Sequence, residues 1–300
     1  MQLENLSLFQ KRIDNYLKQQ LADISVNDQR LFDAMSYGLL IGGKRMRPYL
    51  AYVTAEMLDL DLNDIDPIAA ALECIHAYSL LHDDLPAMDD DNLRRGQPTC
   101  HIKFDEATAI LAGDSLQTLA FEILSNHEFT SISAKTHIKL IQMLSRAAGY
   151  QGMCGGQALD LAATDKLVSL DHLQSIHKLK TGALLEASVL MSAVCREDLP
   201  PQTFTGLQTF ASQIGLAYQV HDDIIDITSS EETLGKPAGS DVDANKSTYP
   251  ALLGLTGAIE KEQHLFQQAL SALDTLPYNT GNLSEFSSFI ILKIYDYRLV

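Results

Sequence analysis

The chain has 300 residues, 46% of them hydrophobic, which is enough apolar material for a sizeable core. With 39 acidic and 22 basic residues its net charge is −17, and this balance argues against a general nucleic-acid binder. Four cysteines, at positions 74, 100, 154 and 195, lack both CxxC and zinc-ligand spacing. We interpret them as isolated small hydrophobic side chains of a protein in a reducing compartment.

Hydrophobic periodicity predicts an all-α chain of long helices, with no linker that would divide it and no strand-like run bounded by hairpin turns. We therefore expect a single domain over residues 1–300. The first apolar stripe suggests a surface or partner-facing helix. No secretory segment and no membrane-spanning apolar run is evident, so we expect a cytoplasmic protein without stable membrane insertion. The expected helices cover about 1–22, 31–40, 67–84, 103–127, 133–162, 170–195, 202–227, 247–274 and 283–298.

A glycine turn follows the second helical pattern. Residues 38–44 satisfy the first places of a phosphate-binding loop, but Arg45 stands where that loop needs Ser or Thr, and no strand precedes it. We therefore reject a nucleotide hydrolase. The turn is predicted to present Lys44, Arg45 and Arg47, and the alternative is a solvent-exposed basic turn without function.

An acidic stretch follows the apolar run 72–81. Asp83 and Asp84 are followed, after Pro86, by three more aspartates at 89–91 and by an arginine pair at 94–95. Five carboxylates so close together repel one another and need counter-charge. Mg²⁺ suits this need, since it combines one or two carboxylates with phosphate oxygens, and paired guanidinium groups also bind phosphate. The alternative is a solvated acidic loop.

A second acidic stretch, at 217–226, repeats the pattern of 77–84. In it Gly215, Gln219, Asp222 and Asp226 follow at helical spacings of four, three and four, so they form one stripe on one helix face. If the two helices face each other, metal ions held between them would bind a diphosphate from both sides.

Three further features complete the pattern. Residues 149–156 are rich in glycine within helical surroundings, which indicates close helix contact or a substrate passing against the backbone. The sequence KTG at 180–182 interrupts another long helix. Residues 228–250 form one long polar loop that carries Lys236 and Lys246, and loops of that length are often functional lids or disordered.

Together these motifs resemble those of the trans-prenyltransferase (polyprenyl synthase) family, in order from about residue 30 to 275. The resemblance is closest to the bacterial farnesyl diphosphate synthases, in which the first aspartate motif has two extra residues, as Pro86 and Ala87 provide here. The motifs are GGKRMRP at 42–48, DDLPAMD at 83–89 with Arg94 and Arg95, GGQALD at 155–160, KTG at 180–182, DDIID at 222–226, and GKPAGSD and NKSTYP within 235–250.

The resemblance implies a bundle of about ten or more helices around a central cavity, a homodimer, and condensation of dimethylallyl or geranyl diphosphate with isopentenyl diphosphate. It implies a Mg²⁺ cofactor, with three ions when diphosphate is bound. Asp83, Asp89 and Asp222 resemble the metal ligands, and Asp84 and Asp226 their supports. The expected residues of the allylic diphosphate site are Arg94, Lys180, Lys236 and Lys246; those of the isopentenyl diphosphate site are Lys44, Arg47, His76 and Arg95; Thr181 and Gln219 match positions whose oxygens face the allylic carbocation.

Product length is the finer question. Tyr78 stands five residues before Asp83, and in this family an aromatic side chain there forms the floor that stops growth at fifteen carbons. Core packing is the alternative role for Tyr78. A geranylgeranyl diphosphate synthase would share every charged motif, whereas a terpene cyclase would have a different second metal motif. A catalytically silent synthase subunit would have lost one aspartate motif, and both are present. The apolar C-terminal tail departs from the family's basic closing helix, although Lys293 and Arg298 remain.

Overall fold

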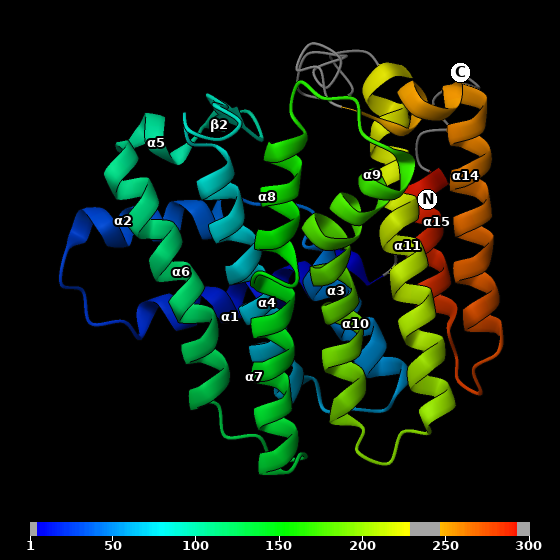
Figure 1. Cartoon of the computed structure of the whole chain (residues 1–300). Helices are drawn as coiled ribbons and strands as arrows, with labels where there is room; N and C mark the ends of the chain where they lie inside the picture. Colours follow the sequence, from blue (N-terminus) through cyan, green and yellow to red (C-terminus); the bar gives the residue numbers. More distant parts are fainter. Residues whose placement is uncertain (1–4, 229–246, 293–300) are drawn as a thin grey trace. The chain divides into compact units, whose positions relative to one another are not determined.

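The computed structural model describes residues 5–228 and 247–292. The chain divides into two compact units, an N-terminal unit of Glu4–Gln142 and a C-terminal unit that begins at Met143. In both units the described residues are overwhelmingly helical, which confirms the predicted all-α class (Figure 1). None of the helices in these ranges is long and apolar enough to cross a membrane.

The N-terminal unit is organised around α4 (Leu62–Asp83), which is apolar on nearly all sides and therefore buried along most of its length. Its start is capped by Asp61, whose carboxylate accepts a hydrogen bond from the backbone N–H of Asn63. It packs against α3 and α6. The other elements are α1 (Leu6–Ala22), α2 (Gln29–Leu40), α3 (Met46–Met57), β1 (Leu93–Arg94), β2 (Gln97–Pro98), α5 (Cys100–Lys103), α6 (Glu106–Asn126) and α7 (Ala134–Ala148), which continues into the second unit.

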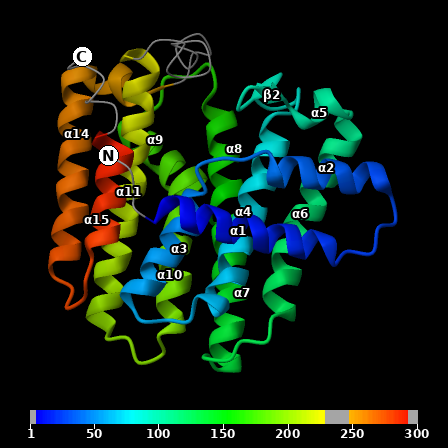
Figure 2. The same ribbon diagram turned by 180° about the vertical axis from the view of Figure 1, so that it is seen from behind.

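The apolar stripe of α1 is buried inside the N-terminal unit. Phe9, Ile13, Leu17 and Leu21 are all nearly inaccessible, and α1 runs across α3 and α4 (Figure 2). On the same helix Arg12 donates two 2.7 Å hydrogen bonds to the carboxylate of Asp66 on α4. The first helix is therefore a surface helix, as one of the two predicted roles has it, and its apolar stripe is covered by the unit's own helices rather than by a partner.

A small hairpin joins α4 to α5. Leu93 pairs with Pro98 and Arg94 with Gln97, and both turn residues have positive φ, 54° at Arg95 and 72° at Gly96. Positive φ at both central residues is typical of two-residue hairpin turns. This hairpin adds to the predicted all-α pattern without changing the fold class, and sequence analysis missed it because two-residue strands are too short to show a periodicity.

The C-terminal unit contains the long antiparallel neighbours α11 and α14, which lie side by side in both views (Figures 1 and 2). Two predicted helices are interrupted. The helix expected over 133–162 breaks at Gly149–Gly152, and the one over 170–195 contains a π-helical turn, η1 (Lys178–Gly182). The remaining elements are α8 (Met153–Ala163), α9 (Leu170–His177), α10 (Ala183–Cys195), α11 (Pro201–Thr228), α14 (Tyr249–Asp274, with a kink at Gly254) and α15 (Gly281–Leu292).

Candidate functional site

The first aspartate motif lies at the C-terminal end of α4. Asp83 is the last residue of the helix, and the backbone N–H of Asp89 donates to the carbonyl of Asp83 over 2.9 Å. This turn returns the chain to the helix end, so that Asp83 and Asp89 lie close along the backbone while Pro86 and Ala87 project outward, exposed. Carboxylates near a helix C-terminus are electrostatically disfavoured, so this end of α4 favours a cation.

Asp84 turns inward, unlike Asp83 and Asp89. Asp84 is 3% exposed. Its carboxylate accepts hydrogen bonds of 2.8 and 2.9 Å from Nε of Arg94, and a further one from another nitrogen of the same guanidinium. Burial raises the pKa of Asp84, and the hydrogen bond from Arg94 opposes that rise. Asp84 therefore holds Arg94 beside the first motif.

The glycine turn at 42–43 is shaped by Arg95. The φ angles of Gly42 and Gly43 are 98° and 132°, which other residues rarely adopt. The guanidinium of Arg95 donates to the carbonyl of Gly42, and a Cβ on Gly43 would lie 2.6 Å from the guanidinium carbon. The backbone conformation therefore favours glycine at position 43, and a Cβ there would also displace the guanidinium of Arg95.

Arg45 corrects the prediction for the basic turn. It is 5% exposed, and its guanidinium binds the carboxylate of Glu73 at 2.7 Å and that of Asp14 at 2.9 Å. It points into the N-terminal unit, so the turn presents Lys44, which is exposed, and Arg47, which is half-buried. Arg45 thus stabilises the turn rather than offering its charge to a ligand.

Cationic side chains surround His76. Burial lowers the pKa of His76 well below its usual value, and the charges of Arg47, Arg95, Arg94 and Arg45 lower it further. The pKa of Arg95 is also lowered, chiefly by burial. The charge of Glu73 opposes this effect, and the charges of neighbouring arginines add to it. The structure thus brings the predicted residues Arg47, His76 and Arg95 into one electropositive region, where an anion would relieve the mutual repulsion.

Tyr78 is 6% exposed and lies on the face of α4 that also carries His82. Their ring centroids are 5.4 Å apart at an interplanar angle of 87°, an edge-to-face contact. The burial is compatible with both predicted roles, core packing and chain-length floor, so the floor remains a prediction.

In the C-terminal unit, four polar residues of the motifs meet in two contacts. Nζ of Lys180 lies 2.7 Å from Oδ2 of Asp160, and Oγ1 of Thr181 donates to Oε1 of Gln219 over 3.1 Å. The structure therefore joins Thr181 of η1 directly to Gln219 of α11. Their predicted role beside the carbocation stays a prediction.

Glycines allow the helices around η1 to approach. A Cβ on Gly156 of α8 would lie 2.2 Å from the backbone nitrogen of Lys180, so any larger residue would displace η1. On the other side, a Cβ on Gly215 would lie 3.5 Å from Cα of Gly182, which is ordinary contact. The predicted close helix contact of the glycine-rich segment is thus confirmed at Gly156, and it fixes the backbone from which Lys180 and Thr181 project.

The second aspartate motif occupies the end of α11. Asp222 is exposed and Asp226 is buried. Between them Asp223 accepts a 2.9 Å hydrogen bond from the backbone N–H of Tyr249, which ties the motif to the start of α14. The predicted ligand Asp222 therefore lies at a helix end that the contact between Asp223 and α14 holds in place.

Sequence reasoning assigned no role to the histidine that precedes each aspartate pair. His221 hydrogen-bonds through Nδ1 to the buried carboxylate of Glu262, and Nε2 of His82 lies 3.0 Å from the carbonyl of Ile110. Their recurrence in both copies of the motif was the available signal. Two predicted residues, Lys236 and Lys246, lie outside the described residues, as do Lys293 and Arg298 of the tail.

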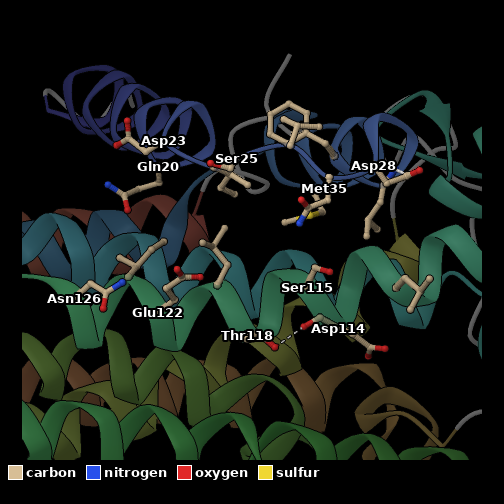
Figure 3. Close-up of a pocket in the computed structure, with 18 residues that line it drawn as sticks. Gln20, Asp23, Ser25, Asp28, Met35, Asp114, Ser115, Thr118, Glu122 and Asn126 are labelled. Atoms are coloured by element: carbon tan, nitrogen blue, oxygen red, sulfur yellow. Dashed lines mark hydrogen bonds between the residues drawn. The ribbon is translucent and has the colours of Figure 1, made fainter.

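A groove in the N-terminal unit lies apart from these residues. It has a volume of about 730 Å³ and runs between α6 and the segment that joins α1 to α2. Figure 3 shows Asp23, Ser25 and Asp28 on one side and Ser115 and Glu122 of α6 on the other. None of the predicted site residues that the structure describes lines it. Within residues 5–228 and 247–292, no group of three or more His, Cys, Asp or Glu side chains is arranged so that it could hold a metal ion.

Comparison with known proteins decides the family. The family model described as polyprenyl synthetase matches residues 28–276. This chain belongs to that family. A Haemophilus influenzae protein named farnesyl diphosphate synthase is 50% identical over 97% of this chain and 98% of its own length. An Escherichia coli protein of the same name is 48% identical over 94% of this chain and 96% of its own.

Solved structures give the same fold. A geranyltransferase from Legionella pneumophila has a TM-score of 0.87 at 36% identity and covers 96% of each chain. A Helicobacter pylori geranyltransferase, complexed with magnesium and isoprenyl diphosphate, has a TM-score of 0.83 at 35% identity and covers 99% of each chain. The comparisons confirm the predicted family, the all-α fold and the prenyltransferase class.

Proposed function

We propose that this chain is a farnesyl diphosphate synthase, which joins isopentenyl diphosphate head-to-tail (1′-4) to dimethylallyl and then geranyl diphosphate and releases diphosphate. The observation that carries the proposal is the electropositive region around His76, which contains Arg47 and Arg95 and lies in the same unit as an accessible aspartate motif. The names of the H. influenzae and E. coli relatives support the product assignment.

The aspartates fit a magnesium cofactor in their chemistry. Mg²⁺ takes one or two carboxylates and completes its shell with water and phosphate oxygens, and the accessible residues Asp83, Asp89 and Asp222 offer such carboxylates. Asp84 and Asp226 support them, and we propose three ions when diphosphate is bound. Bound Mg²⁺ supplies Lewis-acid stabilisation of the departing diphosphate.

The basic residues stabilise charge that develops as the allylic carbon–oxygen bond breaks. Arg94, held by Asp84, and Lys180, held by Asp160, are directed by these contacts before any substrate binds. Together with Lys236 and Lys246 they would hold the allylic diphosphate, and such preorganised charge is worth most where charge appears in the transition state. The hydroxyl of Thr181 donates a hydrogen bond to Oε1 of Gln219, so the lone pairs of the Thr181 oxygen can face the carbocation.

The second substrate needs a separate anion site. We assign the diphosphate of isopentenyl diphosphate to Lys44, Arg47, His76 and Arg95. Burial and the neighbouring arginines lower the pKa of His76, so before a substrate binds its imidazole is neutral and the arginines carry the positive charge. The double bond of isopentenyl diphosphate then attacks the allylic carbon, and the released diphosphate accepts the proton that is lost.

Three further properties belong to the proposal. Residues 1–300 act as one polyprenyl synthase domain, the chain works as a homodimer, and it resides in the cytoplasm. The matched family region and the near-complete coverage of the relatives support the first of these.

Two alternative functions are distinguished from this one, the first by Tyr78 and the second by the aspartate motifs. A geranylgeranyl diphosphate synthase would share the charged residues, but the buried aromatic ring of Tyr78 favours the shorter product. A silent synthase subunit is disfavoured because both aspartate motifs are complete.

Product analysis tests the proposal. Pure protein is incubated with isopentenyl diphosphate, dimethylallyl diphosphate and Mg²⁺, and the dephosphorylated products are separated by chromatography, with EDTA as control. We expect a farnesol peak that EDTA abolishes. Geranylgeraniol as the main product would replace the product assignment and keep the mechanism, whereas no product from any allylic primer would support the silent subunit.

A further inference from the structure

The ring of His82 lies against the ring of Tyr78, one helical turn away on α4. Residues four apart are neighbours on a helix surface. The centroid separation of 5.4 Å and the angle of 87° place the edge of one ring against the face of the other. With Tyr78 at 6% exposure, His82 is a direct neighbour that limits how the Tyr78 ring can move.

His82 is itself held by α6. Its Nε2 donates to the carbonyl of Ile110 at 3.0 Å, and Asp114 lies 3.8 Å from the same nitrogen. A Cβ on Gly113 would lie 2.3 Å from Nε2 and 2.4 Å from Cδ2, so the imidazole rests directly on the backbone of α6. Glycine weakens the interior of a helix relative to alanine. The contact with the imidazole of His82 explains why position 113 is nevertheless a glycine.

We propose that His82 is a positioning residue for product length: seated on Gly113 and bound to Ile110, it fixes the Tyr78 ring in the orientation that stops chain growth. The proposal rests on the proposed farnesyl diphosphate synthase function. It assigns His82 no contact with the substrates. Its effect reaches the product through Tyr78, so it should alter product length more than turnover.

Two variants separate this role from folding. His82→Gln keeps an amide that can donate to Ile110 but removes the aromatic edge from Tyr78. Gly113→Ala leaves both rings in the sequence but displaces the imidazole through the added Cβ. Ser115→Ala, on the same helix α6 and half-buried, is the matched control. Thermal unfolding of each variant reports any general loss of stability.

The ratio of twenty-carbon to fifteen-carbon product is the decisive measurement. For His82→Gln and Gly113→Ala we expect it to rise by about fivefold, the factor that the loss of one aromatic contact supports. Ser115→Ala should not change it. His82→Phe, which restores an aromatic edge, should return the ratio towards that of the unmodified enzyme. An unchanged ratio in folded His82→Gln and Gly113→Ala would overturn the proposal.

A double variant distinguishes this proposal from the function on which it rests. In a Tyr78→Ala background, where we expect longer products already, His82→Gln should produce no further shift, because its effect passes through Tyr78. An additive shift would refute the positioning role and leave the function intact. A failure of Tyr78→Ala to lengthen the product would remove the floor and the proposal together. Absence of farnesyl product from the unmodified enzyme would refute the function itself.

Discussion

Asp160 of α8 binds Lys180 of η1, with Nζ 2.7 Å from Oδ2, across the contact that Gly156 makes possible. Both side chains are about one-fifth exposed, so solvent screens the pair only in part. What the contact does is fix the direction of a flexible ammonium group, which otherwise explores many rotamers. A substrate phosphate would thus meet a lysine that is already confined.

Lys180→Ala is therefore expected to affect catalysis rather than folding. Loss of one preorganised charged donor should lower kcat/KM with geranyl diphosphate by roughly 10²-fold or more, while the midpoint of thermal unfolding changes little. Lys178→Ala is the matched control, since Lys178 is an exposed cation in the same π-helix. Equal losses in the two variants would show that net charge, not the placement of Lys180, matters.

Replacement of neighbouring aspartates tests the metal assignment. Asp89→Asn should reduce activity by roughly 10²–10³-fold and raise the Mg²⁺ concentration needed for half-maximal rate. Asp90→Asn should have little effect, and asparagine tolerates the positive φ of 53° at that position. Steady-state rates over a Mg²⁺ titration provide the measurement. If Asp90→Asn proved the more damaging change, the ligand would have been assigned to the wrong carboxylate.

Adjacent cations in the glycine turn should separate stability from binding. Arg45→Met leaves the carboxylate of Glu73 buried without its main partner, which should cost about 3–5 kcal/mol in the free energy of unfolding. Lys44→Ala should leave that free energy within about 0.5 kcal/mol and instead raise KM for isopentenyl diphosphate. Urea unfolding and steady-state kinetics of both variants measure the two effects. A stable Arg45→Met protein with a raised KM would return Arg45 to the substrate site.

Acid should weaken the C-terminal unit through His177. Burial lowers the pKa of His177 from 6.5 to about 4; the nearby charge of Lys180 adds to this and that of Asp160 opposes it. Between these values the unfolded chain binds the proton and the folded chain does not, so stability falls as pH decreases from about 6.5 to about 4. The full loss over this window is about 3 kcal/mol.

Urea unfolding at pH 5 and pH 7.5 measures this dependence. His177→Gln should flatten it, whereas His264→Gln, which alters an exposed histidine of α14, should leave it as in the unmodified protein. An unchanged pH dependence in His177→Gln would assign the acid sensitivity to other groups.

The helices and the motifs at their ends were predictable because both are local. Apolar spacing located α1, α4 and α11, and Asp83 falls at the end of α4 because Pro86 follows two residues after Asp84. The glycine-rich segment correctly indicated a close contact, and Gly156 makes it.

The direction of single side chains was not predictable in the same way. Arg45 stands among basic residues, and it is drawn into the interior by Glu73 and Asp14, which lie 28 and 31 residues away in the sequence. His82 likewise depends on Gly113 and Ile110, which belong to another helix. These contacts depend on which helices meet, and periodicity within one helix carries no information about that.

The π-helical turn has a consequence for how the chain tolerates insertions and deletions. A π-turn contains one residue more than the α-helical turn it replaces, so α10 is advanced by about 100° in helical phase relative to a continuous helix from α9. A helical wheel that treats residues 170–195 as one continuous α-helix therefore places the residues on one side of η1 on the wrong helix face. Deleting a single residue such as Leu179 would return the segment to α-helical phase and swing Lys180 and Thr181 away from Asp160 and Gln219. The number of residues in this helical segment, more than the identity of any one of them, keeps the side chains of Lys180 and Thr181 in place.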